Sequence, residues 1–154
     1  MARAFFGGVH FDDCKSATNR KAIEVLAPPA QVVLPMSMHI GAPCTPLVKK
    51  GDAVKMGQKI GESAAPISAP VHATVSGTVA AVEPRLHPNG TMVMSVVIDN
   101  DFTDTPDETL AKHGDISEVS AEDIISIVKE AGIVGHGGAT FPTHFKITSG
   151  LGKV

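Results

Sequence analysis

Hydrophobic and polar residues alternate along two stretches in the middle of the chain, residues 71–82 and residues 92–98. A period of two places alternate side chains on one face of a β-strand, so both stretches are predicted strands. The alternating positions are Val71, Ala73, Val75, Gly77, Val79 and Ala81 in the first stretch, and Met92, Met94, Val96 and Ile98 in the second. Gly77 predicts a bend or a close backbone approach, and Asn89-Gly90 predicts a turn between the strands.

A helical period replaces this alternation near the end of the chain. The apolar positions Ile124, Ile127, Val128 and Ala131 follow the spacing i, i+3, i+4, i+7, which predicts a helix with one apolar stripe. Ser120 with Asp123 three residues later predicts a capping box, and Gly132 is suited to end the helix. The acidic, turn-rich residues 101–119 between the two regions predict a linker.

Composition narrows the class of protein. The chain of 154 residues has 15 glycines, 11 prolines and 4% aromatic residues, which favours short strands and tight turns. A net charge of -3 argues against nucleic-acid binding, which needs clustered cations, and the pair Lys49-Lys50 is expected to be a solvated strand rim. No apolar run approaches the roughly 20 residues of a membrane helix, so we expect no direct membrane insertion. Cys14 and Cys44 stand alone, and no pattern predicts a metal site or a catalytic group.

Several histidines and methionines have a structural interpretation. His39 and His72 lie in apolar β segments, and we expect each to be a hydrogen-bonded structural histidine. The methionines of the predicted strands are expected to fill the core or an interface. They are Met36, Met38, Met92 and Met94.

Residues 48–82 resemble lipoyl and biotinyl carrier domains, which have the barrel-sandwich hybrid fold. The matching positions are Gly51, Asp52, Val54, Gly57 and Gln58, followed by Ala69-Pro70 and Gly77-Thr78-Val79. A carrier needs a lysine at the tip of its hairpin, and alignment with the carrier pattern places Pro66 there. Proline has no side-chain amine to acylate, and the stretch ESAAPISAP contains no lysine. The resemblance implies the barrel-sandwich hybrid fold. The missing lysine excludes the function of a lipoyl or biotinyl carrier, so we expect a scaffold.

The stretch GIVGHGGATFPTHFK, residues 132–146, carries a glycine-rich loop. A Walker A loop ends in Gly-Lys-Ser/Thr, which is missing from this stretch. A Rossmann fingerprint follows a strand and carries a third glycine, whereas here a helix comes first and Thr140 stands at the third position. Neither of the two common nucleotide-binding loops fits.

The loop instead resembles the Gly-x-Gly-Gly-Ala-Gly-Phe-Pro-Thr-x-x-Lys signature of the NADH-binding flavoprotein subunit of complex I. Within that superfamily, the chain is similar to the N-terminal part of the RnfC proteins, which belong to the Rnf electron transport complex, an ion-translocating ferredoxin:NAD oxidoreductase. The other matching stretches are FFGGVHFDDCKSAT, LPMSMHIGAPCTPLVKKGDAVKMGQKIGE and SAPVHATVSGTV. The similarity covers essentially the whole chain.

The resemblance implies cofactors, partners and site residues. The intact protein would use FMN, NAD(H) and two [4Fe–4S] clusters, and it would bind other Rnf subunits peripherally on the cytoplasmic side of the membrane. The implied cofactor-binding residues are Gly135, Gly137, Gly138, Ala139, Phe141 and Lys146. The glycines would let the cofactor approach the backbone, Ala139 and Phe141 would line it, and Lys146 would pair with a phosphate. His136 and Thr140 depart from the signature, which has arginine and glycine there.

These interpretations divide the chain into four parts. Residues 1–30 are expected to pack on the β-module as an extension, and residues 31–100 to form a mainly β barrel-sandwich hybrid. Residues 101–119 are the linker, and residues 120–154 are a helix and loop that open a truncated α/β flavin- and NADH-binding domain. In this chain alone we expect a tight helix-to-strand turn without cofactor, because a pocket needs walls. The alternative to an electron-transfer scaffold is a non-catalytic assembly or docking module.

Overall fold

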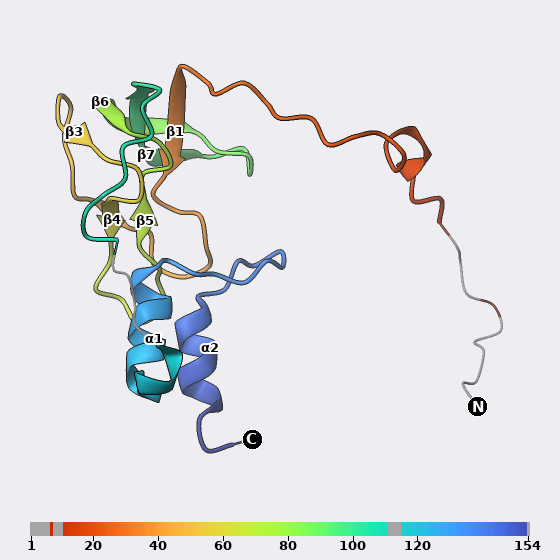
Figure 1. The fold of residues 1–154 in the computed structure, drawn as a ribbon, viewed down its shortest axis with the longest axis vertical. Helices are drawn as coiled ribbons and strands as arrows, with labels where there is room; N and C mark the ends of the chain where they lie inside the picture. Colours follow the sequence, from red (N-terminus) through yellow and green to blue (C-terminus); the bar gives the residue numbers. More distant parts are fainter. Residues whose placement is uncertain (1–6, 8–10, 111–114, 154) are drawn as a thin grey trace.

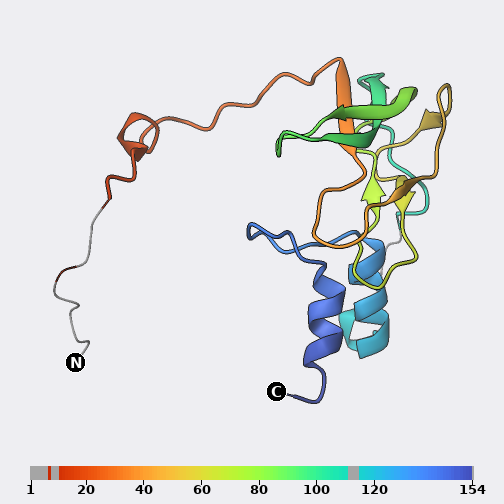
Figure 2. The same ribbon diagram turned by 180° about the vertical axis from the view of Figure 1, so that it is seen from behind.

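The structure, a computed structural model, describes residue 7, residues 11–110 and residues 115–153. A β-module of two sheets forms the upper part of Figure 1, and two helices lie side by side below it. The segment before the first strand runs away from this body, as the view from behind in Figure 2 also shows. The chain is therefore mainly β, as predicted, with a helical part at one end of the β-module.

Both sheets of the β-module are antiparallel, with strand orders β1-β7-β6-β3 and β2-β4-β5. The strands are β1 Gln31–Pro35, β2 Thr45–Pro46, β3 Ala53–Val54, β4 Lys59–Glu62, β5 Val71–His72, β6 Gly77–Leu86 and β7 Met92–Asn100. Gly51 and Gly57 have φ of 91° and 85° and reverse the chain on either side of β3, a conformation that favours glycine. The long β6–β7 hairpin pairs with β1 and β3 in the first sheet, and β2, β4 and β5 form the second sheet.

The core takes side chains from both sheets. Its buried members include Leu34, Met36, Val54, Ile60, Val71, Ala73, Val75, Val79, Val96 and Ile98. The predicted alternation holds up to Val79, but a β-bulge between Val79 and Ala81 shifts the register. Val82 therefore packs against the core, and the prediction for Ala81 was wrong. Side-chain periodicity gives no sign of an extra residue in one strand of a pair.

The β6–β7 hairpin continues beyond the core and projects from the body (Figures 1 and 2). Val96 and Ile98 are fully buried, whereas Met92 and Met94, at the start of β7 nearer the hairpin turn, are 63% and 42% exposed. The predicted turn is confirmed, because Gly90 has a φ of 86° and its N–H donates to the carbonyl of His87 at 2.9 Å. Of the four methionines predicted to fill the core or an interface, Met36 lies in the core and the other three are partly exposed.

Within the described residues, the helical part has two α-helices, α1 (Ala121–Glu130) and α2 (Thr143–Gly150), preceded by the short 3-10 turn η2 (Ile116–Glu118). A second 3-10 turn, η1 (Lys15–Ala17), lies in the segment before β1. The predicted capping box of Ser120 and Asp123 is present, and Gly132 ends α1 with a φ of 67°. The expected turn into a strand was wrong, because the loop leads into α2. Pro142 precedes the first turn with a φ of -55°, where its missing N–H leaves no hydrogen bond unmade. Helix α2 packs against α1.

Residues 11–28 do not make the expected contact with the β-module. All of them are exposed, including the apolar Ile23, Val25 and Leu26, which are 98%, 95% and 88% exposed. Attachment begins at Pro29 and Ala30, whose carbonyls accept hydrogen bonds from the Asn100 side-chain and backbone nitrogens at 3.0 and 2.9 Å. The first ten residues, apart from residue 7, lie outside the described part of the chain.

The predicted linker is partly bound to the β-module. The N–H of Met56 donates to the carbonyl of Thr105, and the N–H of Asp107 donates back to Met56. Ser76 also donates its hydroxyl to the carboxylate of Asp101 at 2.6 Å. None of the helices in the described residues has the length and apolar character that crossing a lipid bilayer requires.

Candidate functional site

The glycine-rich loop is a small hairpin between the two helices. At its base the N–H of Thr143 donates to the carbonyl of Ile133 at 3.0 Å, and that of Gly135 donates to Phe141 at 2.8 Å. At its tip the N–H of Thr140 donates to the carbonyl of Gly137 at 2.9 Å. The tip projects from the body on the side to which the β6–β7 hairpin also points (Figures 1 and 2).

Three of the predicted site residues lie together at the base of this loop. The Nζ atom of Lys146 lies 5.7 Å from the centroid of the Phe141 ring, a cation–π distance. A Cβ atom on Gly135 would lie 2.8 Å from the same Nζ atom, so the glycine leaves room for the lysine. The Phe141 ring also meets Phe145 edge to face, with 5.9 Å between centroids. The structure thus brings these three residues together, and their cofactor-binding role stays a prediction.

The other three predicted residues lie at the exposed tip. A Cβ atom on Gly137 or Gly138 would meet nothing within 4 Å, and neither glycine has a positive φ. Within the described part of the chain, the N–H groups of Gly137, Gly138 and Ala139 have no hydrogen-bond acceptor. Folding alone gives no reason for glycine at these two positions. The side chain of Ala139 is exposed.

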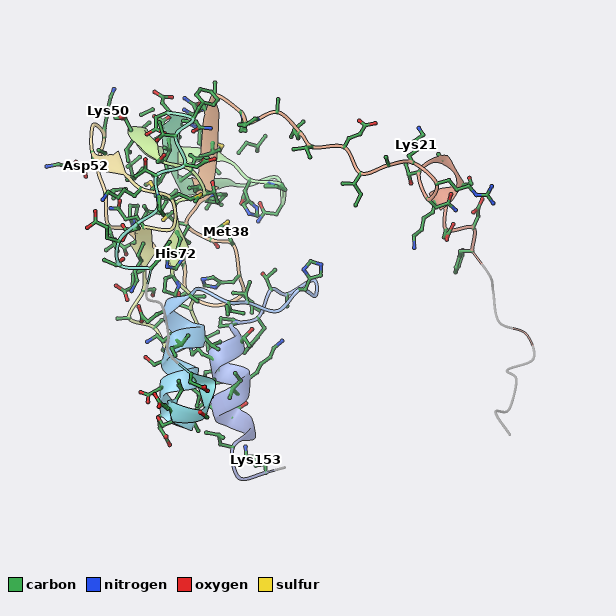
Figure 3. The ribbon with its side chains drawn as sticks, in the orientation of Figure 1. Lys21, Met38, Lys50, Asp52, His72 and Lys153 are labelled. Atoms are coloured by element: carbon green, nitrogen blue, oxygen red, sulfur yellow. The ribbon has the colours of Figure 1, made fainter. Side chains whose placement is uncertain are left out.

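The tip is tied to the β-module by two hydrogen bonds that the sequence does not reveal. The N–H of Ile40 donates to the carbonyl of Ala139 at 3.1 Å, and the hydroxyl of Thr140 donates to the carbonyl of Met38 at 2.9 Å. Figure 3 labels Met38 at the side of the β-module that faces the loop. Thr140 has a φ of 43°, unusual for a β-branched residue, at the position where the signature has glycine.

A second junction joins α1 to β4 and β5. Lys59 forms ion pairs with Glu130 on α1 and with Glu62 on its own strand. The hydrogen bond to Glu130 raises the pKa of Lys59, and the same bond lowers the pKa of Glu130. His72, labelled in Figure 3, lies against Gly132, where a Cβ atom would be 3.2 Å from its Nδ1 atom. Burial, and then the charge of Lys59, lower the pKa of His72.

Two more histidines hold loops of the β-module. The Nε2 atom of His39 lies 3.1 Å from the backbone nitrogen and 3.1 Å from the carbonyl oxygen of Ala69, and its Nδ1 atom lies 3.1 Å from the carbonyl oxygen of Ile40. His39 is thus a hydrogen-bonded structural histidine, as predicted. His144 on α2 is buried, with its Nε2 atom 3.3 Å from the carbonyl of Pro66. The position that bears the lysine in a carrier is therefore in contact with α2.

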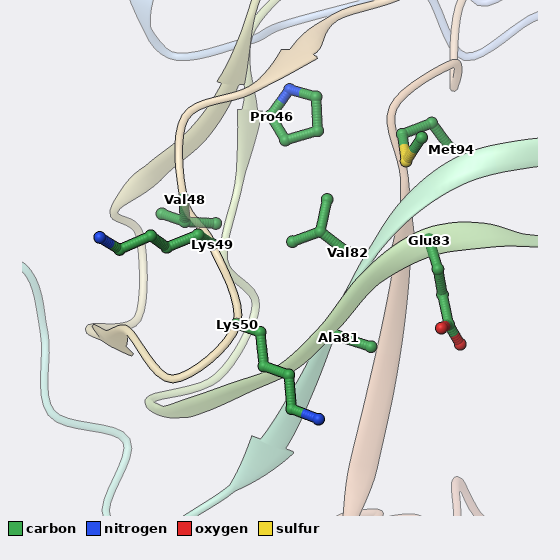
Figure 4. Close-up of a pocket in the computed structure, with 8 residues that line it drawn as sticks. All are labelled: Pro46, Val48, Lys49, Lys50, Ala81, Val82, Glu83 and Met94. Carbon is green, nitrogen blue, oxygen red and sulfur yellow. The ribbon is translucent and has the colours of Figure 1, made fainter.

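A separate open groove lies between the β2–β3 turn and the β6–β7 hairpin (Figure 4). Val48 and Val82 form part of its apolar lining, and Lys49 and Lys50 lie along its side. Lys50 was predicted to lie on a solvated rim and is exposed. Among the described residues, no cluster of histidine, cysteine and acidic side chains could hold a metal ion.

Comparison with known protein families identifies the β-module. The model of a family described as RnfC Barrel sandwich hybrid domain matches residues 3–103. The match agrees with the two facing antiparallel sheets and with the fold that the carrier-like turns predicted.

Curated relatives match almost the whole chain. The chain is 50% identical over 143 residues to the C subunit of the Na(+)-translocating ferredoxin:NAD(+) oxidoreductase complex of Acetobacterium woodii, covering 93% of this chain and 32% of the relative. It is 43% identical over 147 residues to the C subunit of the proton-translocating complex of Clostridium ljungdahlii, covering 96% and 32%. It is 36% identical over 156 residues to the C subunit of the ion-translocating oxidoreductase complex of Vibrio cholerae, covering 97% and 19%. The chain thus spans a third or less of the length of these relatives.

Proposed function

Because the chain belongs to the RnfC barrel-sandwich-hybrid family, we propose that it is the N-terminal scaffold of the NADH-oxidising or NAD-reducing subunit of an ion-translocating ferredoxin:NAD oxidoreductase. In this proposal the β-module carries the loop of residues 135–141, and the loop forms one wall of a flavin and NAD(H) site. Other subunits of the complex are the partners, and the assembly lies peripherally on the cytoplasmic side of the membrane. The two [4Fe–4S] clusters would be ligated by residues outside this chain.

The observation that carries the proposal is the tip of the loop. Gly137 and Gly138 have open space around them, and the N–H groups of residues 137–139 have no acceptor in the described part of the chain. Adjacent backbone amides of this kind bind anionic oxygens such as those of a phosphate. These three N–H groups suit a cofactor phosphate. Binding of a phosphate here would also explain why residues 137 and 138 are glycine, which the fold does not require.

The residues at the base of the loop would complete this wall. A bound FMN would supply the acceptance of a hydride and the release of single electrons. Lys146 would leave the Phe141 ring and direct its charge to a phosphate, as a flexible ammonium can. Phe141 would then present a flat apolar face. His136 lacks the permanent charge of the arginine in the signature, so more of the charge pairing falls to Lys146.

A chimera tests the proposal. This chain would be joined to the remaining part of the Acetobacterium subunit, and the purified protein should be yellow and bleach when NADH is added. Gly137→Ala in the chimera should weaken flavin binding about tenfold, because one methyl group stands where the cofactor must approach. Gly150→Ala, at the end of α2, is the matched control. A folded chimera that binds neither FMN nor NADH, beside an unaltered relative that does, would refute the proposal.

The second candidate is an assembly module with no redox role of its own. The exposed apolar residues Ile23, Val25 and Leu26 favour it, because such a stretch suits contact with another protein. Titration of the 154-residue chain with FMN and with NADH tests whether the loop binds a cofactor without the rest of the subunit. We expect no micromolar binding, which would amount to about 8 kcal/mol, since the loop is only one wall of a site. Micromolar binding would show that the loop works alone.

A further inference from the structure

The β-module and the glycine-rich loop meet along two short segments, residues 38–40 and residues 139–140. Two hydrogen bonds join them, from the N–H of Ile40 to Ala139 and from the hydroxyl of Thr140 to Met38. The bonded residues Thr140 and Met38 are 102 residues apart in the sequence. These bonds hold the loop at residues 139–140, next to the free N–H groups of residues 137–139.

The conformation of Thr140 depends on this contact. Its φ of 43° lies in the left-handed region, which is unfavourable for a β-branched side chain. Such a conformation persists only where the surrounding structure holds it. The surrounding group is the carbonyl of Met38, which accepts the Thr140 hydroxyl at 2.9 Å.

The segment that receives the loop is itself fixed to the β-module. His39 accepts the N–H of Ala69, and the N–H of Ala42 donates to the carbonyl of Ile67 at 3.0 Å. A Cβ atom on Gly41 would lie 2.2 Å from that same carbonyl oxygen, so the two backbones are in close contact. Residues 38–42 therefore form a firm support for the loop.

We propose that Thr140 is a positioning residue, whose hydroxyl holds the glycine-rich loop on residues 38–40 and so orients the N–H groups of Gly137, Gly138 and Ala139. This inference rests on the proposed function for its purpose, but not for its geometry. The β-module then has a specific role, because it fixes the direction of the amides that receive the cofactor. A loop held in advance loses less conformational entropy when it binds.

Three variants of the 154-residue chain test the contact without any ligand. Thr140→Val keeps the shape of the side chain and removes the hydroxyl donor, whereas Thr140→Ser keeps the hydroxyl. Thr140→Gly removes the hydroxyl and also removes the energetic cost of the positive φ. The readout is hydrogen exchange of the Ile40 amide, with Val97 in the core as the reference for global unfolding. We expect Val and Gly to speed Ile40 exchange about fivefold to tenfold, as the loss of one hydrogen bond would, and Ser to restore slow exchange.

These experiments distinguish a failure of the positioning role of Thr140 from a failure of the proposed function. Unchanged Ile40 exchange in Thr140→Val, or a serine variant as fast as valine, would overturn the positioning role. The same variants in the chimera add the FMN dissociation constant, which should rise for valine and stay near the original for serine. Faster exchange with unchanged FMN binding would keep the contact and refute the role of this loop in the cofactor site.

Discussion

Gly77 is the residue at which the fold leaves least room for a side chain. A Cβ atom there would lie 1.9 Å from the backbone carbonyl oxygen of Asp99 on β7, and neither strand can move without breaking the sheet. We expect Gly77→Ala to lower the free energy of unfolding by about 3 kcal/mol or more, the range of severe overpacking. The free energy of unfolding is measured by urea denaturation that is followed by circular dichroism.

Gly137→Ala is the matched control for that change. Nothing lies within 4 Å of its Cβ position and its φ suits any residue, so the free energy of unfolding should change by less than about 0.5 kcal/mol. A loss similar to that of Gly77→Ala would mean that Gly137 has a structural role. The interpretation of the tip as a binding surface would then lose its main support.

His72 makes the stability of the α1 junction depend on pH. Burial and the nearby Lys59 lower its pKa, so the folded chain binds this proton less tightly than the unfolded chain does. Its contribution is full above the ordinary value of 6.5 and is lost as the pH falls from there toward the folded pKa. The Lys59–Glu130 pair acts in a lower window, because the pKa of Glu130 is lowered from 4.5.

We therefore expect His72→Gln to remove part of the acid destabilisation that the original chain shows below pH 6.5. The measurement is the free energy of unfolding in urea on either side of that pH. His136→Gln, at an exposed position on the loop and away from the α1 junction, is the control. Equal pH dependence in the original chain and in His72→Gln would contradict the assignment.

At the scale of elements, helix α1 depends on its N-terminal cap. The Ser120 hydroxyl accepts the N–H of Asp123 at 3.1 Å, and Asp123 accepts from the N–H of Ser120. Ser120→Ala should lower the free energy of unfolding by about 1 kcal/mol. Ser126→Ala, on the exposed side of the same helix, should change it by less than about 0.5 kcal/mol. Equal effects, measured by urea unfolding, would show that the cap contributes nothing particular.

Elements with strong local signals were predictable from the sequence, and those set by pairing were not. The capping box, the Gly132 helix end and the turn at Gly90 each depend on a few adjacent residues, and each is present. The bulge after Val79 exists only because β7 pairs with β6, so the alternation misplaced Ala81. Helix α2 follows a proline and is only eight residues long, a length at which tertiary contacts decide.

For the whole molecule, the sequence predicted the β-module, whereas the cofactor-binding role of the loop residues stays a prediction. The cluster of Gly135, Phe141 and Lys146 forms because these residues are close in the chain. The attachment of Thr140 to Met38 could not be predicted, since the departure of Thr140 from the signature indicates no partner and 102 positions separate the two residues. The family match shows the barrel-sandwich hybrid domain over residues 3–103, and the hydrogen bonds of the structure place this domain relative to the loop.

The arm of residues 11–28 provides a test of how the whole molecule is built. Three of its apolar side chains, those of Ile23, Val25 and Leu26, are almost fully exposed, so replacing these three with serine should change the free energy of unfolding by less than about 0.5 kcal/mol. The changes are Ile23→Ser, Val25→Ser and Leu26→Ser. Ile60→Ser, at a fully buried position, is the contrasting variant and should cost about 3 kcal/mol or more.

Urea unfolding of the two variants decides between two arrangements of this arm. If the triple variant is as stable as the original chain, the apolar stretch is free to contact a partner, as an assembly role requires. If it loses stability on the scale of Ile60→Ser, the arm packs on the β-module in solution, as the sequence led us to expect for residues 1–30. The second result would contradict the exposed arm, because burial of three apolar side chains stabilises a fold by several kcal/mol, at about 1.5–3 kcal/mol each.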